Sequence, residues 1–206
     1  MNILRKISND PRGYIVSKYI SYKNSIIAFY STIKCRTIMT IKGVEYGRGS
    51  KFRGTTMFHR SPESIIKIGN NVTFNSSSRF NFRGINHKCI LQTSSKGRII
   101  IGDGCGFSGV SIVSSIGVTL GKNVMCGTNV MIGDRNDHED KYPQFQPEEI
   151  NIGDNVWIGM NCVIMKGVSI GENSIIGANS LVTKDIPANC IAVGTPCKVI
   201  KYIENK

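Results

Sequence analysis

A branched apolar side chain recurs at every sixth position over much of the C-terminal half of the chain. The positions concerned are Ile152, Ile158, Ile164, Ile170, Ile176 and Val182. An α-helix does not produce this period, because residues share a helix face at spacings of three, four and seven. Six is an even number, so an extended chain returns each of these side chains to one face. With Gly153 and Asn155 placed where a corner is needed, the pattern predicts a parallel β-helix of stacked coils.

The positions where this period breaks are as informative as the period itself. Leu120, Cys126 and Ile132 are in phase, but the next in-phase residue is Ile152, twenty residues later, and twenty is not a multiple of six. The rhythm is also lost over residues 83–98. We therefore expect residues 133–151 to form a loop extruded from the coils. The loop sequence is polar and contains two prolines, as expected of a surface loop that carries function.

The N-terminal region has helical rather than six-residue spacing. Asp10 and Pro11 are suited to the N-cap and the first position of a helix over residues 11–34. An apolar stripe follows at steps of three and four, formed by Ile15, Tyr19, Tyr22, Ile26, Tyr30 and Ile33. We expect this stripe to pack on the coils or on a neighbouring subunit, and the alternative is a helix lying at a membrane interface.

The positive charge of the chain is concentrated near its N-terminus. The formal net charge is +12, and residues 1–60, with twelve Lys/Arg and two acidic residues, account for +10 of it. Such a segment favours anionic partners, for example phosphorylated substrates or lipid surfaces. We expect no nucleic-acid partner, since neither a binding motif nor an aromatic reading surface is present.

Cysteine usage and hydropathy bear on the cellular compartment. The seven cysteines include no CxxC pair, and Cys126 and Cys162 fall at inward positions of the repeat, which favours a reduced, cytoplasmic protein. The start of the chain does not read as a signal peptide, and no apolar stretch approaches the ~18 residues of a spanning helix. We expect a cytoplasmic protein, with peripheral binding to the inner face of the membrane as a further option for its basic helix.

These patterns divide the chain into two parts. Residues 1–45 form a basic, helical segment, and residues 46–206 form the β-helix with its extruded loop. Prolines end the repeat after Val182, and we expect residues 183–206 to form a cap that covers the last coil.

Residues 152–200 contain the segments VWIG, VTKDIP and GTPCKVI in that order. With these motifs the chain resembles the hexapeptide-repeat O-acetyltransferases, the group that includes galactoside, maltose and polysaccharide acetyltransferases, over roughly residues 65–203. The resemblance implies an all-β fold, a left-handed parallel β-helix of triangular section with three hexads per coil. It also implies a homotrimer with active sites between subunits, acetyl-CoA as the donor, and a hydroxyl of a sugar or polysaccharide as the acceptor.

The interrupting loop contains the candidate catalytic residue, His138. The family places its catalytic histidine in a loop with text like D-x-D-x-H, which here reads Asp134-Arg135-Asn136-Asp137-His138. A neutral imidazole can take the acceptor's hydroxyl proton as the oxygen attacks the thioester directly. Either Asp134 or Asp137 could orient the imidazole. Asn136 stands where the family commonly has an acidic residue, and we assign it to substrate binding.

The resemblance also suggests donor-binding and acceptor-binding positions. The donor positions are Gly159, Met160 and Ala178 along the pantetheine arm, and Thr183, Lys184 and Lys198 near the phosphates of CoA. Trp157 lies between two inward positions and must point outward, towards a ligand or another subunit. Ser108 is a weak substitute for an acceptor-binding asparagine found in many relatives.

Other classes of protein fit the sequence less well. A γ-type carbonic anhydrase needs three zinc-binding histidines, and His59, His87 and His138 lack the required spacing. We expect no metal. An N-acetyltransferase acting on an amino-sugar nucleotide and an O-acetyltransferase acting on a xenobiotic remain alternatives within the family. A purely structural or binding solenoid is the alternative outside enzymes, and it would leave the histidine loop unexplained.

Overall fold

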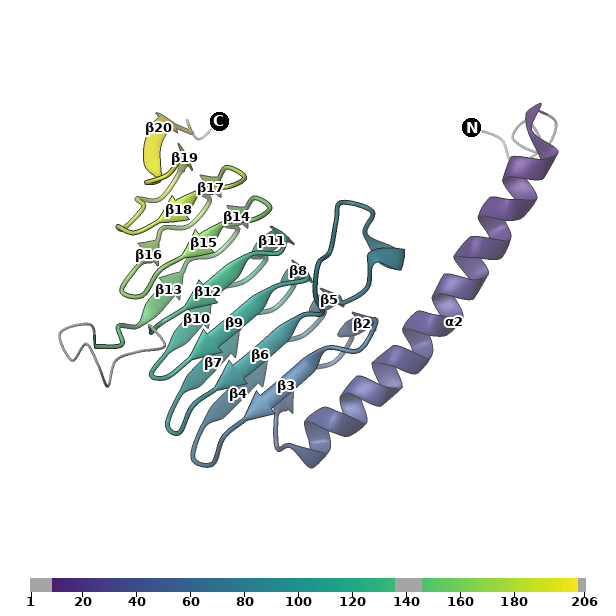
Figure 1. Ribbon diagram of the computed structural model, residues 1–206, viewed down its shortest axis with the longest axis horizontal. Coiled ribbons are helices and arrows are strands. Elements are labelled where there is room, and N and C mark those ends of the chain that lie inside the picture. Colours follow the sequence, from purple (N-terminus) through teal and green to yellow (C-terminus); the bar gives the residue numbers. More distant parts are fainter. Residues whose placement is uncertain (1–8, 136–145, 204–206) are drawn as a thin grey trace.

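The computed structural model describes residues 9–135 and 146–203 of the chain. Short strands wind into three parallel sheets that form the sides of a left-handed β-helix (Figure 1). Sheet A contains β1 (Glu45–Tyr46), β4 (Ile65–Ile68), β7 (Arg98–Ile101), β10 (Val118–Leu120), β13 (Ile150–Ile152) and β16 (Ser169–Ile170). Sheet B contains β2 (Lys51–Arg53), β5 (Thr73–Asn75), β8 (Gly106–Ser108), β11 (Met125–Thr128), β14 (Trp157–Ile158), β17 (Ile175–Ile176), β19 (Cys190–Val193) and β20 (Lys198–Tyr202). Sheet C contains β3 (Met57–Arg60), β6 (Ile90–Thr93), β9 (Ser111–Ser114), β12 (Met131–Gly133), β15 (Val163–Ile164) and β18 (Leu181–Val182).

The register of the strands confirms the predicted coil length. Ile152 pairs with Ile170, so three hexads make one turn of the β-helix. Leu120 pairs with Ile152 in spite of the residues inserted between them. The insertion therefore leaves the stack without disturbing its register, and the strands on either side continue the same sheets.

The predicted repeat positions form the core of the coils. The six repeat residues from Ile152 to Val182 are each at most 3% exposed. In the N-terminal coils the corresponding place in sheet B is filled by phenylalanines. Phe52, Phe74 and Phe107 stack with ring centroids 5.1 and 5.0 Å apart. Repetition thus gives each coil an apolar neighbour above and below, which buries its inward face.

Asparagine side chains hold one corner of the coils. Asn123, Asn155, Asn173 and Asn189 each have φ near +57°, a left-handed conformation that asparagine tolerates better than most residues. Their side-chain amides form a ladder from coil to coil, with N···O distances of 3.1, 3.1 and 3.0 Å. The asparagines therefore turn the chain and also join successive coils.

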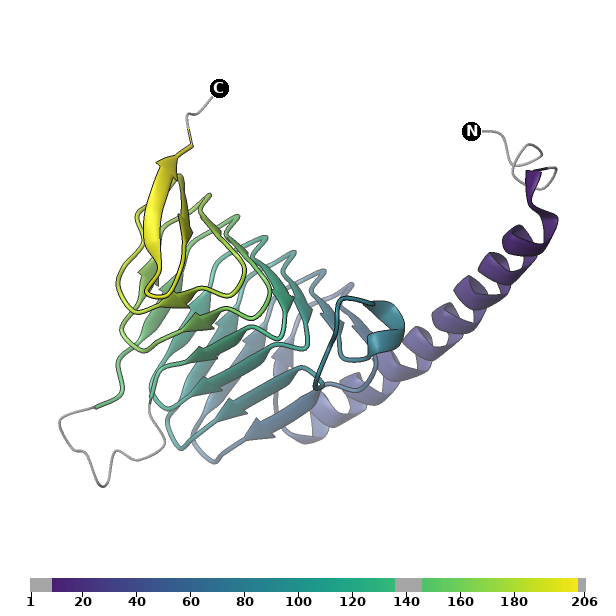
Figure 2. The ribbon, with the colours of Figure 1, turned by 45° about the horizontal axis from the view of Figure 1, so that its top comes forward.

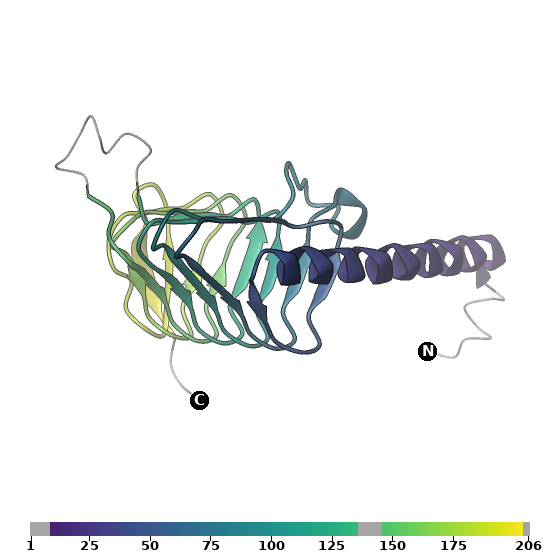
Figure 3. The ribbon, with the colours of Figure 1, turned by 90° about the horizontal axis from the view of Figure 1, so that it is seen from below.

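Helix α2 (Pro11–Ile41) begins where the sequence predicts and ends seven residues later than expected. The Asp10 carboxylate accepts a hydrogen bond from the Gly13 N–H at 2.8 Å, which confirms it as the N-cap. The helix contacts the coils near its C-terminal end, where Cys35 and Met39 are buried and Thr32 Oγ1 accepts a hydrogen bond from the Phe52 N–H at 3.0 Å. The remainder extends away from the stack (Figures 2 and 3).

The predicted apolar stripe of α2 does not pack on the coils of its own chain, so that part of the expectation is wrong, while packing on a neighbouring subunit stays a prediction. All six residues of the stripe are exposed, Tyr22 to 69%. The side chains that do pack are those of the last turns, which the predicted stripe did not include. The stripe is therefore available to a partner outside the chain.

Two segments leave the regular path of the coils. Residues 76–89, which include the 3₁₀ helix η1 (Ser78–Phe80), lie between β5 and β6, at the corner where sheet B meets sheet C. The other joins β12 to β13, at the corner where sheet C meets sheet A. It is shorter than the predicted 133–151, because Gly133 and residues 150–151 belong to strands.

The C-terminal residues extend sheet B. Strand β19 pairs in parallel with β17, and β20 turns back to pair antiparallel with β19. Within the described part of the chain, no helix is long and apolar enough to cross a membrane.

Candidate functional site

A groove of about 680 Å³ runs along the corner between sheets B and C. One wall, called the overhanging wall, is formed by residues 80–83 of the first excursion, the segment 76–89. The second excursion is the segment between β12 and β13. The other side of the groove is formed by successive coils. The coil residues that line it are Gly127, Thr128, Trp157, Gly159, Met160, Ile175, Ile176, Gly177 and Ala178.

Glycines form the floor of this groove because the coils approach closely at this corner. A Cβ atom on Gly159 would lie 2.5 Å from the backbone nitrogen of Ala178, and one on Gly127 would lie 2.7 Å from that of Met160. No side chain fits at either place. The backbone is therefore bare along the groove, which allows an elongated ligand to lie against it.

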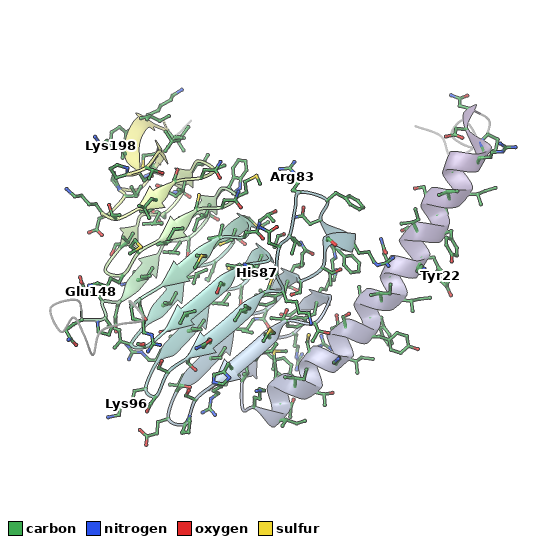
Figure 4. All side chains as sticks on the ribbon, in the orientation of Figure 1. Tyr22, Arg83, His87, Lys96, Glu148 and Lys198 are labelled. Carbon is green, nitrogen blue, oxygen red and sulfur yellow. The ribbon has the colours of Figure 1, made fainter. Side chains whose placement is uncertain are left out.

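The overhanging wall is held by the asparagine at the corner below it. The Asn129 side chain donates a hydrogen bond to the Gly84 carbonyl at 2.9 Å and accepts one from the Asn86 N–H at 3.0 Å. Asn81 donates a weaker one to Thr128 Oγ1 at 3.4 Å. These bonds fix the loop over the groove, with Arg83 at its tip (Figure 4).

Aromatic rings face the groove from both sides. Phe82 on the overhanging wall is 91% exposed, and Trp157 on the coils is 55% exposed. The outward direction predicted for Trp157 is confirmed. Large apolar rings exposed on two walls of one groove form a surface suited to the flat faces of a ligand.

The structure brings together four of the residues suggested by sequence. Trp157, Gly159, Met160 and Ala178 all line this groove. Three others do not line it: Thr183 and Lys184 follow β18 and are exposed, and Lys198 lies on β20.

Ser108 does not reach the groove either. It is 7% exposed, and its hydroxyl accepts a hydrogen bond from Asn75 Nδ2 at 3.1 Å. Its side chain is engaged between two neighbouring coils of sheet B.

Asp134 is a fully buried carboxylate at the end of β12. One oxygen accepts a hydrogen bond from the Ser115 N–H at 2.7 Å. The other accepts three, from Ser114 Oγ at 2.8 Å and from the N–H groups of Ile116 and Gly117 at 2.9 and 2.8 Å. Four donors from the preceding coil occupy this carboxylate, which anchors the start of the second excursion.

The other end of that excursion is also held. The Glu148 N–H donates to the Asp134 carbonyl at 2.9 Å, so the two ends lie side by side. Lys166 donates to the Gln146 carbonyl at 2.8 Å and forms an ion pair with the Glu148 carboxylate. The predicted residues Asn136, Asp137 and His138 lie between these ends, outside the described residues.

Sequence reasoning missed the overhanging wall. Residues 83–98 were noted for a lost rhythm without a role being assigned to them. Phe80 keeps the six-residue spacing from Phe74, which predicted a further coil position, whereas the structure places it in η1 on the wall. The signal that could have identified the wall is the text Asn81-Phe82-Arg83 that follows it. Nothing in the period indicates where such a segment lies in space.

The cysteines are structural. All seven are buried and free of disulfides. Burial raises the pKa of the Cys105 thiol to about 11 and raises that of Cys126 well above its ordinary value, so both are neutral thiols near pH 7. Over residues 9–135 and 146–203, no group of three or more metal-ligating side chains could hold an ion.

Comparison with known proteins gives a match to a sequence family. The family described as "Bacterial transferase hexapeptide (six repeats)" matches residues 149–184. The galactoside O-acetyltransferase of Escherichia coli (strain K12) is 46% identical over 101 residues, which are 47% of this chain and 50% of that protein. The chain thus spans about half the length of this curated relative.

Solved structures are similar over a larger share of the chain. A galactoside acetyltransferase in complex with coenzyme A has a TM-score of 0.51 and 30% identity, covering 78% of this chain and 65% of that one. The polySia specific acetyltransferase NeuO has a TM-score of 0.52 and 25% identity, covering 79% of this chain and 81% of its own.

Proposed function

The chain belongs to the hexapeptide-repeat acyltransferase family, and we propose that it transfers an acetyl group from acetyl-CoA to a hydroxyl of a sugar or polysaccharide. The observation that carries this proposal is the groove between the overhanging wall and the bare glycine corner. It brings together Trp157, Gly159, Met160 and Ala178, which the family resemblance and their coil positions had suggested for donor or substrate binding.

The donor fits this groove in chemical terms. A pantetheine arm is an extended chain with two amides, and a floor without side chains exposes the backbone that such amides require. The CoA phosphates would then lie beyond the groove, at the exposed Thr183, Lys184 and Lys198, where lysines neutralise their charge. The similar galactoside acetyltransferase is a complex with coenzyme A.

We assign the transfer step to His138 as general base. Its imidazole takes the proton of the acceptor hydroxyl while the oxygen attacks the thioester carbonyl carbon. The tetrahedral intermediate collapses with cleavage of the C–S bond, and the imidazolium returns the proton to the leaving thiolate. Backbone N–H groups along the groove stabilise the oxyanion.

The two carboxylates of the second excursion then have different roles. Asp134 already accepts four hydrogen bonds, so we propose that it is a positioning residue. It would fix the start of the second excursion, which contains His138 and is called the histidine segment. Asp137 is left as the residue that orients the imidazole, and Asn136 as an acceptor contact.

We further propose that the protein acts as a homotrimer with its sites between subunits. The groove lies at the corner of sheets B and C, whereas the histidine segment leaves at the corner of sheets C and A. Glu148, at the base of that segment, lies across the coils from Arg83 (Figure 4). A second copy can supply its own histidine segment to the groove of the first, which completes a site that is divided in a single chain.

The exposed part of α2 supports peripheral binding to an anionic membrane, where a glycan acceptor would be assembled. Residues 11–41 contain five Lys/Arg and no acidic residue, and their isoleucines and tyrosines are largely exposed. Apolar side chains together with cations are typical of interfacial helices. Flotation with phosphatidylserine vesicles should retain the protein, Tyr22→Asp should weaken retention several-fold, and equal flotation of the variant would contradict this role.

The test of the activity is incubation with acetyl-CoA and a panel of hydroxyl and amine acceptors, read by mass spectrometry. We expect one acetyl group on a sugar hydroxyl, whereas acetylation of amines alone would favour the N-acetyltransferase alternative. His138→Ala should lower kcat by ~10²–10⁴-fold, the usual contribution of a general base. His59→Ala is the matched control, because His59 is exposed on sheet C and should be silent. Full activity of His138→Ala would refute the mechanism.

A further inference from the structure

A second hollow lies behind the overhanging wall, between the wall and helix α2. It consists of two adjoining cavities of about 580 and 380 Å³ that share Ile20 and Asn24 of the helix. Phe80 and Phe82 line these cavities on one side and the groove on the other. We call this hollow the α2 cleft, and define it by Ile20, Asn24, Arg53, Arg79, Phe80 and Phe82.

The α2 cleft carries positive charge without carboxylates. Arg53 lines one cavity and Arg79 lines the other. Among the described residues, the basic partners of ion pairs are Lys67, Arg98 and Lys166, and neither Arg53 nor Arg79 forms such a pair. Neither α2 nor residues 76–89 contain an aspartate or glutamate. Two guanidinium groups in a concave, carboxylate-free surface favour an anionic ligand.

A buried polar atom in the same place lacks a partner. The side-chain oxygen of Asn24 is buried, and no hydrogen-bond donor of the described residues reaches it. Asn24 lines both cavities, so this acceptor lies at their junction. An unpaired buried acceptor costs free energy in the unliganded protein, and a ligand hydroxyl would satisfy it.

The remaining surface of the cleft is apolar. Ile20 is one turn of helix from Asn24, and Phe80 and Phe82 lie on the facing wall. An apolar face, an amide acceptor and a guanidinium are the groups that together recognise a sugar ring with hydroxyls and an acidic substituent.

We propose that the α2 cleft binds an anionic sugar unit of the acceptor glycan, carrying a carboxylate or a phosphate. The unit next along the glycan would cross Phe80 and Phe82 into the groove where acetyl transfer takes place. This inference rests on the proposed function, and it adds the class of acceptor: an acidic rather than a neutral glycan. A membrane surface is a poorer occupant, since a bilayer contacts convex helix faces and does not enter a cleft.

The first experiment measures binding by calorimetry to the full chain with three probes. Hexagalacturonate carries carboxylates, glucose 1-phosphate carries a phosphate, and maltohexaose is neutral. We expect one or both anionic probes to bind with an affinity that falls with salt, and the neutral probe to bind at least 10-fold more weakly. Arg79→Gln should weaken the anionic probe at least 10-fold. Lys96→Gln, which removes one positive charge from a distant edge of the coils (Figure 4), should leave it unchanged.

Asn24 provides a second variant that separates binding from folding. Asn24→Leu removes the unpartnered amide and improves helix propensity, so the melting temperature should rise while affinity for the anionic probe falls several-fold. Asn24→Asp should abolish binding by placing a carboxylate in the cleft. A lower melting temperature for Asn24→Leu together with unchanged affinity would assign Asn24 to structure alone.

Failure of this inference can be told apart from failure of the proposed function. Quenching of Trp157 fluorescence by CoA reports the groove and should be the same in Arg79→Gln. If the protein without substitutions does not bind CoA, the proposed function is contradicted. When CoA binding is normal, three results would contradict the proposed role of the α2 cleft. Neither anionic probe binds, maltohexaose binds equally well, or phosphatidylserine vesicles alone displace the probes.

Discussion

The same kinds of apolar side chain are buried in the coils and exposed on helix α2. In the coils, Ile158, Ile164 and Ile176 are almost fully buried, each between a residue above and one below. On α2, Ile15 is 66% exposed although it belongs to an equally regular pattern. A repeat supplies its own neighbours, whereas a lone helix that leaves the first coil does not.

This difference separates stability from recognition in the molecule. Apolar residues of the coils should determine the free energy of unfolding, and apolar residues of α2 should determine what the protein binds. Substitutions in the two regions can therefore be compared directly.

The largest effect on stability is expected in the coils. Ile170→Ala should lower the free energy of unfolding by about 2–5 kcal/mol, because it leaves a cavity in a stack that cannot collapse. Ile15→Ala on α2 is the matched control and should change it by less than about 0.5 kcal/mol. Urea denaturation of both variants measures the contrast. Similar losses would show that α2 is packed in solution and would remove the distinction.

The next largest effect on stability is expected at Asp134, the buried carboxylate at the start of the segment that contains His138. Asp134→Asn replaces one acceptor oxygen by an amide that opposes backbone N–H donors of residues 115–117. We expect a loss of about 1–3 kcal/mol in stability. The positioning role proposed for Asp134 predicts that kcat falls with little change in the KM for acetyl-CoA. A variant with normal kcat would show that the anchor serves the coils only.

The asparagine corner allows strain and the ladder to be separated. Asn173→Ala places at φ +57° a residue that tolerates the left-handed conformation less well than asparagine, and it removes two ladder contacts, to Asn155 and to Asn189. Asn173→Gly removes the contacts but tolerates the angle. We expect the alanine variant to be less stable than the glycine variant by about 1 kcal/mol, measured by thermal unfolding. Equal stability would mean that the ladder, not the angle, selects asparagine.

The smallest effect concerns the pH dependence of the coils. The Cys105 pKa is raised from 9.0 to about 11 by burial. Between these values the folded protein keeps a proton that the unfolded chain has lost, so stability falls as pH rises through this window. Cys105→Ala should lessen the slope of stability against pH between 9 and 11. An unchanged slope would show that the thiol is not protected from water.

The sequence predicted the coils well because their spacing is a local property. Ile152 and Ile170 pair as the three-hexad coil requires, and Trp157 points outward between two inward neighbours. Asp10 caps α2 for the same reason, since a cap needs only the next three residues. The candidate site was partly predictable, because Met160 and Ala178 are equivalent positions of successive coils.

Residues of the site that do not follow the period could not be located from sequence. Arg83 is 74 residues before Trp157 in the chain, yet both line one groove. Asn24 and Arg79 are brought to one cleft by a helix and a loop whose relative placement no local pattern records. The same applies to Asp134, one of the two carboxylates predicted as candidates to orient the histidine, because its four hydrogen-bond donors come from the coil before it.

The sequence by itself therefore determined the β-helix, its coil length and the departure between β12 and β13, because a six-residue period acts on each residue through its near neighbours. It indicated the other departure, residues 76–89, only as a lost rhythm over residues 83–98. The tertiary structure decided which of those departures overhangs a groove, which carboxylate is occupied, and that the stripe of α2 remains exposed. These outcomes depend on contacts between segments far apart in the chain, and such contacts are made only when the coils have stacked.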